Sequence, residues 1–248
     1  MPYINNAGIN IYYEVVGKGT PMVLHHPGGN CVQDWYALGY IGLLKDHYQL
    51  ILIDARGHGK SDKPHTQEYY SIKSRAEDTI AVMDALKIKQ AICFGYSMGG
   101  RISFALMYYF PERFTHFIIG GANPYSPTGL MESMKNLLAN GITDLVTETE
   151  KALGRFPEKV RTNYLENDKN ALIAAYSIDW FDLSECLNRI SVPCLFYVGS
   201  KDPIASKIFQ YANLIQNSQV KILSGLNHLQ VYWQAPLVTD LIFQFIKI

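Results

Sequence analysis

The sequence carries no excess of charge of either sign, because its 22 Lys and Arg residues are matched by 22 Asp and Glu residues. Proteins that bind nucleic acid or anionic membranes usually present a basic surface, so this balance argues against both kinds of partner. The sequence also lacks an apolar run long enough to cross a membrane, and its N-terminus lacks the pattern of a signal peptide. We therefore expect a cytoplasmic protein that is not bound to membranes.

Cysteine is scarce, and its spacing matches neither a zinc motif nor a CxxC pair. The four cysteines are Cys31, Cys93, Cys186 and Cys194. Cys93 and Cys194 lie in apolar runs typical of buried strands, where free thiols fit a reducing compartment. No HExxH motif is present, and we expect no metal site. A phosphate loop before Ser61 is excluded, because the pattern requires glycine where Asp54 stands.

The sequence does contain a regular alternation of strand and helix patterns over 248 residues, 48% of them hydrophobic. Short apolar runs rich in β-branched residues predict strands, and helical spacing of apolar residues predicts helices between them. The predicted strands are residues 9–16, 21–25, 49–54, 91–96, 117–120, 193–198 and 220–223, and the predicted helices between or after them are residues 71–86, 98–110 and 232–246. This alternation predicts an α/β fold with a mostly parallel central sheet covered by helices on both faces.

One stretch, residues 123–190, contains no strand pattern. Ser126 and Pro127 form a helix start, and Gly141 forms a helix end. Three more helix patterns follow, at residues 143–153, 157–166 and 168–178. We interpret the stretch as a helical cap, inserted into a core domain made of residues 1–122 and 191–248. Because the insertion begins and ends within the alternating pattern, we expect a lid and not an independent domain.

The segment Gly95-Tyr96-Ser97-Met98-Gly99 matches the G-x-S-x-G nucleophile elbow. Three fixed positions are a weak signal alone, but a strand pattern runs directly into this segment and a helix pattern starts directly after it. Such a tight turn strains the serine backbone, requires small neighbours and lifts the hydroxyl above the sheet edge. Ser97 is therefore the candidate nucleophile. The N–H of Met98, at the helix start, is the first candidate donor to an oxyanion.

A nucleophilic serine needs a base, and histidine has a suitable pKa. Of the seven histidines, His228 lies in a loop after the last strand, on the same sheet edge as Ser97. Asp202 follows the strand at 193–198 on that edge, and it is the candidate acid that orients the imidazole. Asp54 also ends a strand and is the competing candidate, although the turn after it looks structural.

With these motifs, the sequence resembles the α/β-hydrolase superfamily over essentially its whole length. The resemblance rests on His25–Gly29, Asp54–Ser61, Gly95–Gly99, Gly199–Asp202 and Asn227–His228, in this order along the chain. It implies a Ser–His–Asp triad in that superfamily's chain order of serine, acid and histidine. It also implies no cofactor and a helical cap over the pocket. Within the superfamily the chain looks most similar to small capped serine esterases and lactonases.

The sequence departs from the family pattern in the loop after the strand at 21–25. Family members usually have His-Gly-x there, and the N–H of x completes the oxyanion hole. The corresponding residues here are His25, His26 and Pro27. Proline has no N–H, so the second donor is missing or comes from a neighbour, for which Gly28 is the candidate. His26 replaces the glycine, and it either reaches the pocket or packs beside the neighbouring loop.

Side chains that flank the nucleophile or lie in the aromatic-rich cap are candidates for a mostly apolar pocket. Many aromatic residues of the cap pack it onto the core instead. The candidate substrate-binding residues are His26, Tyr96, Tyr125 and Trp180.

These features predict a serine hydrolase that cleaves a carboxylic ester, lactone or thioester of a small, mostly apolar substrate through an acyl-enzyme on Ser97. The same triad also supports acyl transfer, perhydrolysis or hydrolysis of a carbon–carbon bond, because fold and triad do not discriminate among them. A slow ligand receptor is the alternative from another class, and Pro27 is the feature that favours it. The expected partner is a small ester-like molecule, and the expected assembly is a monomer or homodimer.

Overall fold

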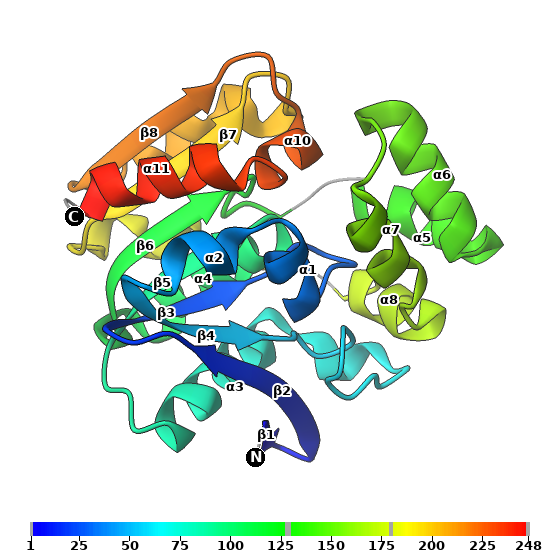
Figure 1. The fold of residues 1–248 in the computed structure, drawn as a ribbon, viewed down its shortest axis with the longest axis horizontal. Helices are drawn as coiled ribbons and strands as arrows, with labels where there is room; N and C mark the ends of the chain where they lie inside the picture. The colour runs from blue at the N-terminus through cyan, green and yellow to red at the C-terminus, as the bar shows by residue number, and fades with distance from the viewer. Residues whose placement is uncertain (1, 127–129, 179–180, 247–248) are drawn as a thin grey trace.

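The computed structural model describes residues 2–126, 130–178 and 181–246. Its centre is an eight-stranded sheet in the order β1-β2-β4-β3-β5-β6-β7-β8 (Figure 1). The first strands pair antiparallel, β1 with β2 and β2 with β4, and all later pairs are parallel. The strands are β1 Tyr3–Asn6, β2 Ile9–Val16, β3 Thr20–His25, β4 Tyr48–Ile53, β5 Ala91–Tyr96, β6 Phe114–Gly120, β7 Cys194–Gly199 and β8 Ser218–Leu223. The predicted fold class is confirmed.

Helices cover both faces of the sheet because the central strands are apolar on both sides. Leu50 and Leu52 of β4 pack into one cluster, and Ile51 and Ile53 pack into the other. One face carries α1 Val32–Ala37, α2 Tyr40–Leu44, α10 His228–Tyr232 and α11 Ala235–Ile246, and the other carries α3 Ile72–Ala85, α4 Met98–Tyr109 and α9 Ile208–Ala212 (Figure 1). Because successive side chains of a strand point to opposite faces of the sheet, the apolar strands form two hydrophobic cores, one on each side.

Within the described residues, four α-helices lie between β6 and β7, at the carboxyl edge of the sheet (Figure 1). They are α5 Leu130–Asn140, α6 Ile142–Leu153, α7 Glu158–Leu165 and α8 Lys169–Tyr176. Their buried apolar residues form a cluster of their own, which Leu229 and Trp233 of the core join at its edge. The predicted helix start at Pro127 lies outside the described residues. The division into a core and a cap at residues 123 and 190 stays a prediction.

The sequence patterns missed the shortest elements. β1 has four residues with only alternating partial burial, and α1 and α2 have six and five residues. The C-terminal helix predicted at residues 232–246 is α11, which has Pro236 in its first turn, where proline is accepted. The five-residue helix α10 before it was missed, because residues 225–228 were predicted to be a loop.

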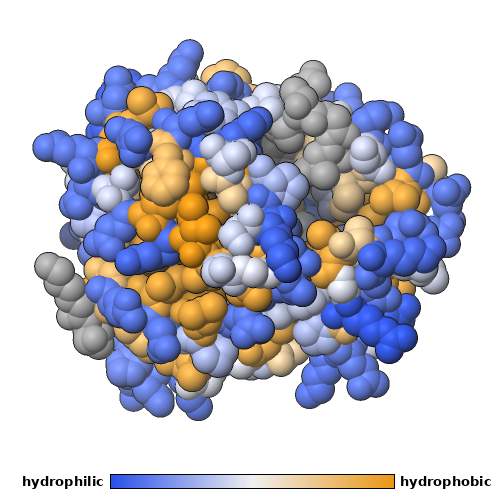
Figure 2. All heavy atoms as spheres, turned by 90° about the horizontal axis from the view of Figure 1, so that it is seen from above, coloured by the Kyte–Doolittle hydropathy of each residue, from blue (hydrophilic) through white to orange (hydrophobic). Residues whose placement is uncertain are grey.

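The surface at the β8 end of the sheet mixes charged and apolar side chains. Figure 2 shows this face, where apolar groups gather between charged ones. Phe209 of α9, Ile222 of β8 and Leu237 of α11 are among the exposed large hydrophobic residues of the chain. No helix within the described ranges is long and apolar enough to cross a membrane.

Candidate active site

The turn between β5 and α4 holds Ser97 in a backbone conformation that side chains rarely adopt, with φ 54° and ψ −114°. The glycines around it are required by close approach. A side-chain carbon on Gly95 would lie 2.3 Å from the Gly99 carbonyl oxygen, and one on Gly99 would lie 2.0 Å from the His25 carbonyl oxygen. The Ser97 N–H donates to the Gly120 carbonyl at 2.9 Å. Strand and helix are thus pressed together, and the strained serine stands between them.

Three predicted residues from distant parts of the chain meet at this turn. His228 Nε2 lies 2.9 Å from Ser97 Oγ, and His228 Nδ1 lies 2.6 Å from Asp202 Oδ2. An ionised carboxylate only accepts hydrogen bonds, so Nδ1 carries the proton and Nε2 is left to accept from the serine hydroxyl. The Asp202 side chain is 2% exposed and the His228 side chain is 25% exposed. The arrangement can move a proton from serine to histidine beside a buried negative charge.

His228 is positioned by its own helix start and by a buried tyrosine. Asn227 caps α10, accepting from the Gln230 N–H at 3.0 Å, and donates to the Leu153 carbonyl of the cap at 2.8 Å. The Tyr96 hydroxyl donates to the His228 carbonyl at 2.6 Å, and the two rings are 5.4 Å apart. These contacts fix where the imidazole stands.

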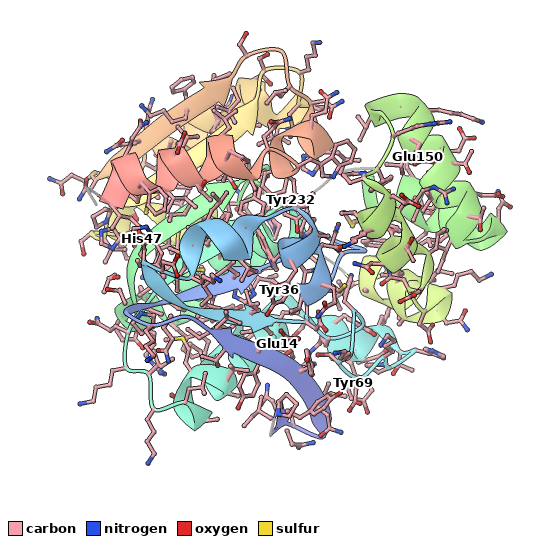
Figure 3. The ribbon with its side chains drawn as sticks, in the orientation of Figure 1. Glu14, Tyr36, His47, Tyr69, Glu150 and Tyr232 are labelled. Atoms are coloured by element: carbon pink, nitrogen blue, oxygen red, sulfur yellow. The ribbon has the colours of Figure 1, made fainter. Side chains whose placement is uncertain are left out.

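Tyr96 is therefore not placed as a substrate contact, contrary to the sequence-based expectation. It is 0% exposed, and its ring stacks on that of Tyr232. Tyr232 is the last residue of α10 and is labelled in Figure 3. As a strand residue next to the nucleophile, Tyr96 points to the opposite side of the pleat from its neighbour and into the core. Its role in this structure is to support the start of α10, where His228 lies.

Asp54, the competing acid, is bonded to backbone N–H groups, whereas the carboxylate on His228 is that of Asp202. Asp54 Oδ1 accepts from the Val32 N–H at 2.6 Å, and its Oδ2 accepts from the Lys60 N–H at 2.8 Å. Burial raises the pKa of this carboxyl, and the nearby His26 opposes that rise. Asp54 thus joins the start of α1 to the turn after β4.

His26 is also turned away from the pocket, so the structure favours the packing alternative for it. Its Nε2 accepts from the Ala55 N–H at 3.0 Å, and its Nδ1 lies 2.7 Å from the Pro27 carbonyl. Both ring nitrogens are therefore engaged with backbone, and the residue is 1% exposed. Burial lowers the pKa of His26, which keeps it neutral.

The two candidate oxyanion donors lie next to one another. Met98 is the first residue of α4, so its N–H has no partner within the helix. The turn after β3 is closed by the Asn30 N–H, which donates to the Pro27 carbonyl at 3.2 Å and leaves the Gly28 N–H out of that bond. A side-chain carbon on Gly28 would lie 3.8 Å from Met98 Cβ. The turn thus brings Gly28 beside the nucleophile elbow.

Helix α7 and the residues just after it contact the same turn and the neighbouring helix α1, and two of these residues, Asn163 and Asn167, were not candidates from the sequence. Asn163 of α7 donates to Asp34 Oδ1 at 2.7 Å, and Asn167 donates to the Gly29 carbonyl at 2.6 Å. The Tyr164 ring lies where a side chain on Gly29 would stand, 2.1 Å from that position. Burial raises the Asp34 pKa to about 6, against the lowering effect of its hydrogen bonds. These contacts join segments more than a hundred residues apart, and no local pattern signals them.

The remaining candidates do not line a described pocket. The Tyr125 carbonyl accepts from Arg101 at 2.7 Å, and its ring packs 6.3 Å from that of Tyr211, so it secures the start of the cap segment. Trp180 lies outside the described residues. A hollow of about 440 Å³ between residues 65–68 and α8, and another of about 170 Å³ beside α7, both exclude Ser97, Asp202 and His228. No described group of three or more His, Cys, Asp or Glu residues is arranged to hold a metal ion.

Comparison with known proteins supports the same fold and identifies a family to which the chain is similar. The profile of the alpha/beta hydrolase fold family matches residues 20–146. The chain is 30% identical to 3-oxoadipate enol-lactonase 1 of Acinetobacter baylyi over 179 residues, covering 67% of this chain and 66% of the relative. It is 27% identical to the non-heme chloroperoxidase of Streptomyces lividans over 272 residues, covering 97% of each.

A solved structure extends the likeness to the whole molecule. The crystal structure of the enol-lactonase from Burkholderia xenovorans LB400 superposes with a TM-score of 0.87, at 22% identity, covering 100% of both chains. The strand–turn–helix at Ser97 lies inside the segment that the family profile matches. The chain belongs to the alpha/beta hydrolase fold family.

Proposed function

We propose that the protein hydrolyses a carboxylic ester or lactone of a small, mostly apolar molecule through an acyl-enzyme on Ser97. The observation that carries this proposal is the unbroken contact chain from Ser97 Oγ to His228 and on to Asp202, at 2.9 and 2.6 Å. Membership of a hydrolase family and the resemblance to a relative named as a lactonase support it.

In the first half-reaction Ser97 Oγ attacks the substrate carbonyl carbon, and His228 Nε2 takes the hydroxyl proton. Buried Asp202 stabilises the imidazolium that forms. The N–H groups of Met98 and Gly28 face the carbonyl oxygen as it becomes negative, at the positive end of α4. His228 then gives its proton to the leaving oxygen, and the C–O bond breaks.

In the second half-reaction water attacks the acyl-enzyme, and the same histidine acts again. His228 takes a proton from the water while the carbonyl oxygen passes through the same oxyanion site. Return of the proton to Ser97 Oγ releases the acid and restores the free enzyme. The side chain of His228 is partly exposed, as this exchange with water requires.

A second reaction on the same acyl-enzyme is perhydrolysis, in which hydrogen peroxide replaces water as the attacking nucleophile. The relative named as a non-heme chloroperoxidase favours this candidate, because it matches 97% of the chain. Both reactions share the first half-reaction, so they differ only in the acceptor that enters the site. Adding peroxide to a steady-state ester assay and measuring the peracid product distinguishes them.

The test of the proposal is hydrolysis of p-nitrophenyl acetate, butyrate and octanoate by the wild type, Ser97→Ala and Ser103→Ala. Ser103 is a buried serine of the same helix whose hydroxyl donates to the Gly99 carbonyl, so it is the matched control. We expect many turnovers by the wild type and the control, and a loss of at least about 10⁴-fold in Ser97→Ala. Turnover that survives in Ser97→Ala, or no turnover by the wild type, would reject the proposal.

A further inference from the structure

The hydroxyl of Tyr176, at the end of cap helix α8, lies against the turn that carries Gly28. A side-chain carbon on Gly28 would lie 3.0 Å from the Tyr176 oxygen and 3.8 Å from Met98 Cβ. The hydroxyl therefore occupies the space that any larger residue at position 28 would fill. It lies beside Gly28, one of the two candidate backbone donors, yet it comes from a different part of the chain.

Tyr176 is held from two sides. The Tyr164 hydroxyl lies within hydrogen-bonding reach of the Tyr176 hydroxyl. The Tyr164 ring itself rests on Gly29, and Asn167 binds the Gly29 carbonyl at 2.6 Å. The tyrosine is 7% exposed, so its ring has little freedom to rotate away. A hydroxyl fixed in this way keeps a constant place relative to the turn.

A buried cation, Arg75, lies near the Tyr176 hydroxyl. Arg75 of α3 places Nη1 2.9 Å from Met98 Sδ and Nη2 3.4 Å from the Ala175 carbonyl. Burial raises the pKa of the Tyr176 hydroxyl, and the Arg75 charge opposes that rise. The phenol therefore stays protonated at neutral pH and keeps a proton to donate, while the positive charge favours negative charge nearby.

We propose that the Tyr176 hydroxyl is a third donor to the oxyanion, completing a hole that the backbone N–H groups of Met98 and Gly28 begin. This inference rests on the proposed function. Pro27 gives the physical reason, because the turn after β3 offers one N–H fewer than a turn without proline. The cap is then part of the catalytic machinery: the oxyanion site is complete only while α8 is seated on the turn.

The test is the variant Tyr176→Phe, which keeps the ring and removes only the hydroxyl. We expect kcat for p-nitrophenyl butyrate to fall about 10- to 100-fold with KM changed less than about threefold, because the donor acts on the transition state. Phosphonylation of Ser97 by a fluorophosphonate passes through similar oxygen charge and should slow by a comparable factor. Tyr164→Phe, which leaves Tyr176 in place, should give a smaller loss of kcat.

The matched control is Tyr40→Phe, which removes another buried hydroxyl, bonded at 2.9 Å to the Tyr232 carbonyl. It should keep kcat even if its thermal stability drops. Unchanged kcat and phosphonylation in Tyr176→Phe would overturn the inference, and so would an effect confined to KM.

A failure of this inference can be distinguished from a failure of the proposed ester hydrolysis. If the esters are not turned over, the phosphonylation rates still measure the effect of the hydroxyl. If Tyr176→Phe does not fold, Tyr176→Met, which also removes the hydroxyl, replaces it with the same expected losses, and unchanged kcat and phosphonylation in Tyr176→Met would overturn the inference.

Discussion

Two histidine–carboxylate clusters lie at the same edge of the sheet, and they differ in what their nitrogens touch. In one, His228 joins Asp202 to the hydroxyl of Ser97. In the other, His26 lies beside Asp54, but both of its ring nitrogens face backbone groups. His228 is partly exposed and His26 is sealed.

The comparison shows that residue type and sheet edge do not make a catalytic pair. Asp54 and Asp202 both follow strands, and both are buried. Asp54 uses its two oxygens on the N–H groups of Val32 and Lys60, so it fastens loops. Asp202 uses one oxygen on the Ile204 N–H and turns the other to the imidazole. Of the two clusters, only that of His228 has a ring nitrogen facing a hydroxyl, that of Ser97, and it is therefore the one we propose to be catalytic.

The largest predicted effect is a difference in kcat between substitutions of His228 and of His26. We expect His228→Ala to lower kcat by about 10⁶-fold, the loss that follows removal of the base in a serine protease triad. His26→Ala should instead lower the free energy of unfolding by about 2–4 kcal/mol, because it opens a buried site and leaves the Ala55 N–H without its acceptor. Its kcat, corrected for folded fraction, should stay within about a hundredfold of wild type. Ester kinetics and urea unfolding of both variants check this, and a larger kcat loss in His26→Ala would contradict the comparison.

The next largest predicted effect is a difference in kcat between substitutions of Asp202 and of Asp54. Asp202→Asn should lower kcat by about 10⁴-fold at nearly unchanged stability, because the amide favours the wrong imidazole tautomer. Asp54→Asn should lower the free energy of unfolding by about 1–3 kcal/mol, since an amide nitrogen replaces one of two buried acceptors. Equal kcat losses in the two variants would mean that Asp54 also acts in the reaction. The same kinetic and urea measurements decide between these outcomes.

The smallest predicted effect is a pH dependence of the free energy of unfolding that comes from three buried histidines, His25, His26 and His58. Burial lowers the pKa of His25 to about 3, and it also lowers the pKa of His26 and His58. Below pH 6.5 the unfolded chain therefore binds more protons, so the free energy of unfolding should fall as pH drops, by up to about 1.4 kcal/mol per pH unit for one histidine. Asp34 opposes this between its ordinary pKa and about 6, because its carboxyl binds the proton more tightly when folded.

Thermal unfolding at pH 7, 6 and 5 measures this dependence. We expect the midpoint to fall with pH, and to fall less steeply in His25→Gln. The matched control is His47→Gln, a change at the exposed histidine labelled in Figure 3. A midpoint that is constant or rises toward pH 5 would contradict the account of the sealed cluster.

The sheet and the Ser97 cluster were predictable because their signals are local. Each of Ser97, Asp202 and His228 follows a run that reads as a strand, and parallel strands bring their carboxyl ends to one edge. By contrast, β1, α1 and α2 are too short to show a period. Tyr96 was expected at the substrate and is buried instead, and for His26 the sequence left open whether it reaches the pocket or packs beside a loop. Adjacency in sequence does not say which way a side chain points.

The cap contribution was beyond prediction for a different reason. Tyr176 reaches Gly28 across the chain, and Asn167 reaches Gly29 over 138 residues. Such contacts depend on how α7 and α8 settle on the core, which no spacing rule encodes. The glycines at 28 and 29 were visible in the sequence, but their reason, the two tyrosines packed on them, is a property of the folded molecule.

The most direct test of the central claim is the site and rate of covalent labelling by a fluorophosphonate, followed by peptide mass spectrometry. The account predicts one adduct per chain, on Ser97. It should be absent in Ser97→Ala and strongly slowed in His228→Ala, and His26→Ala should retain it. An adduct on another residue, or equal labelling of the wild type and His228→Ala, would contradict the claim that Ser97 and His228 form the reactive pair.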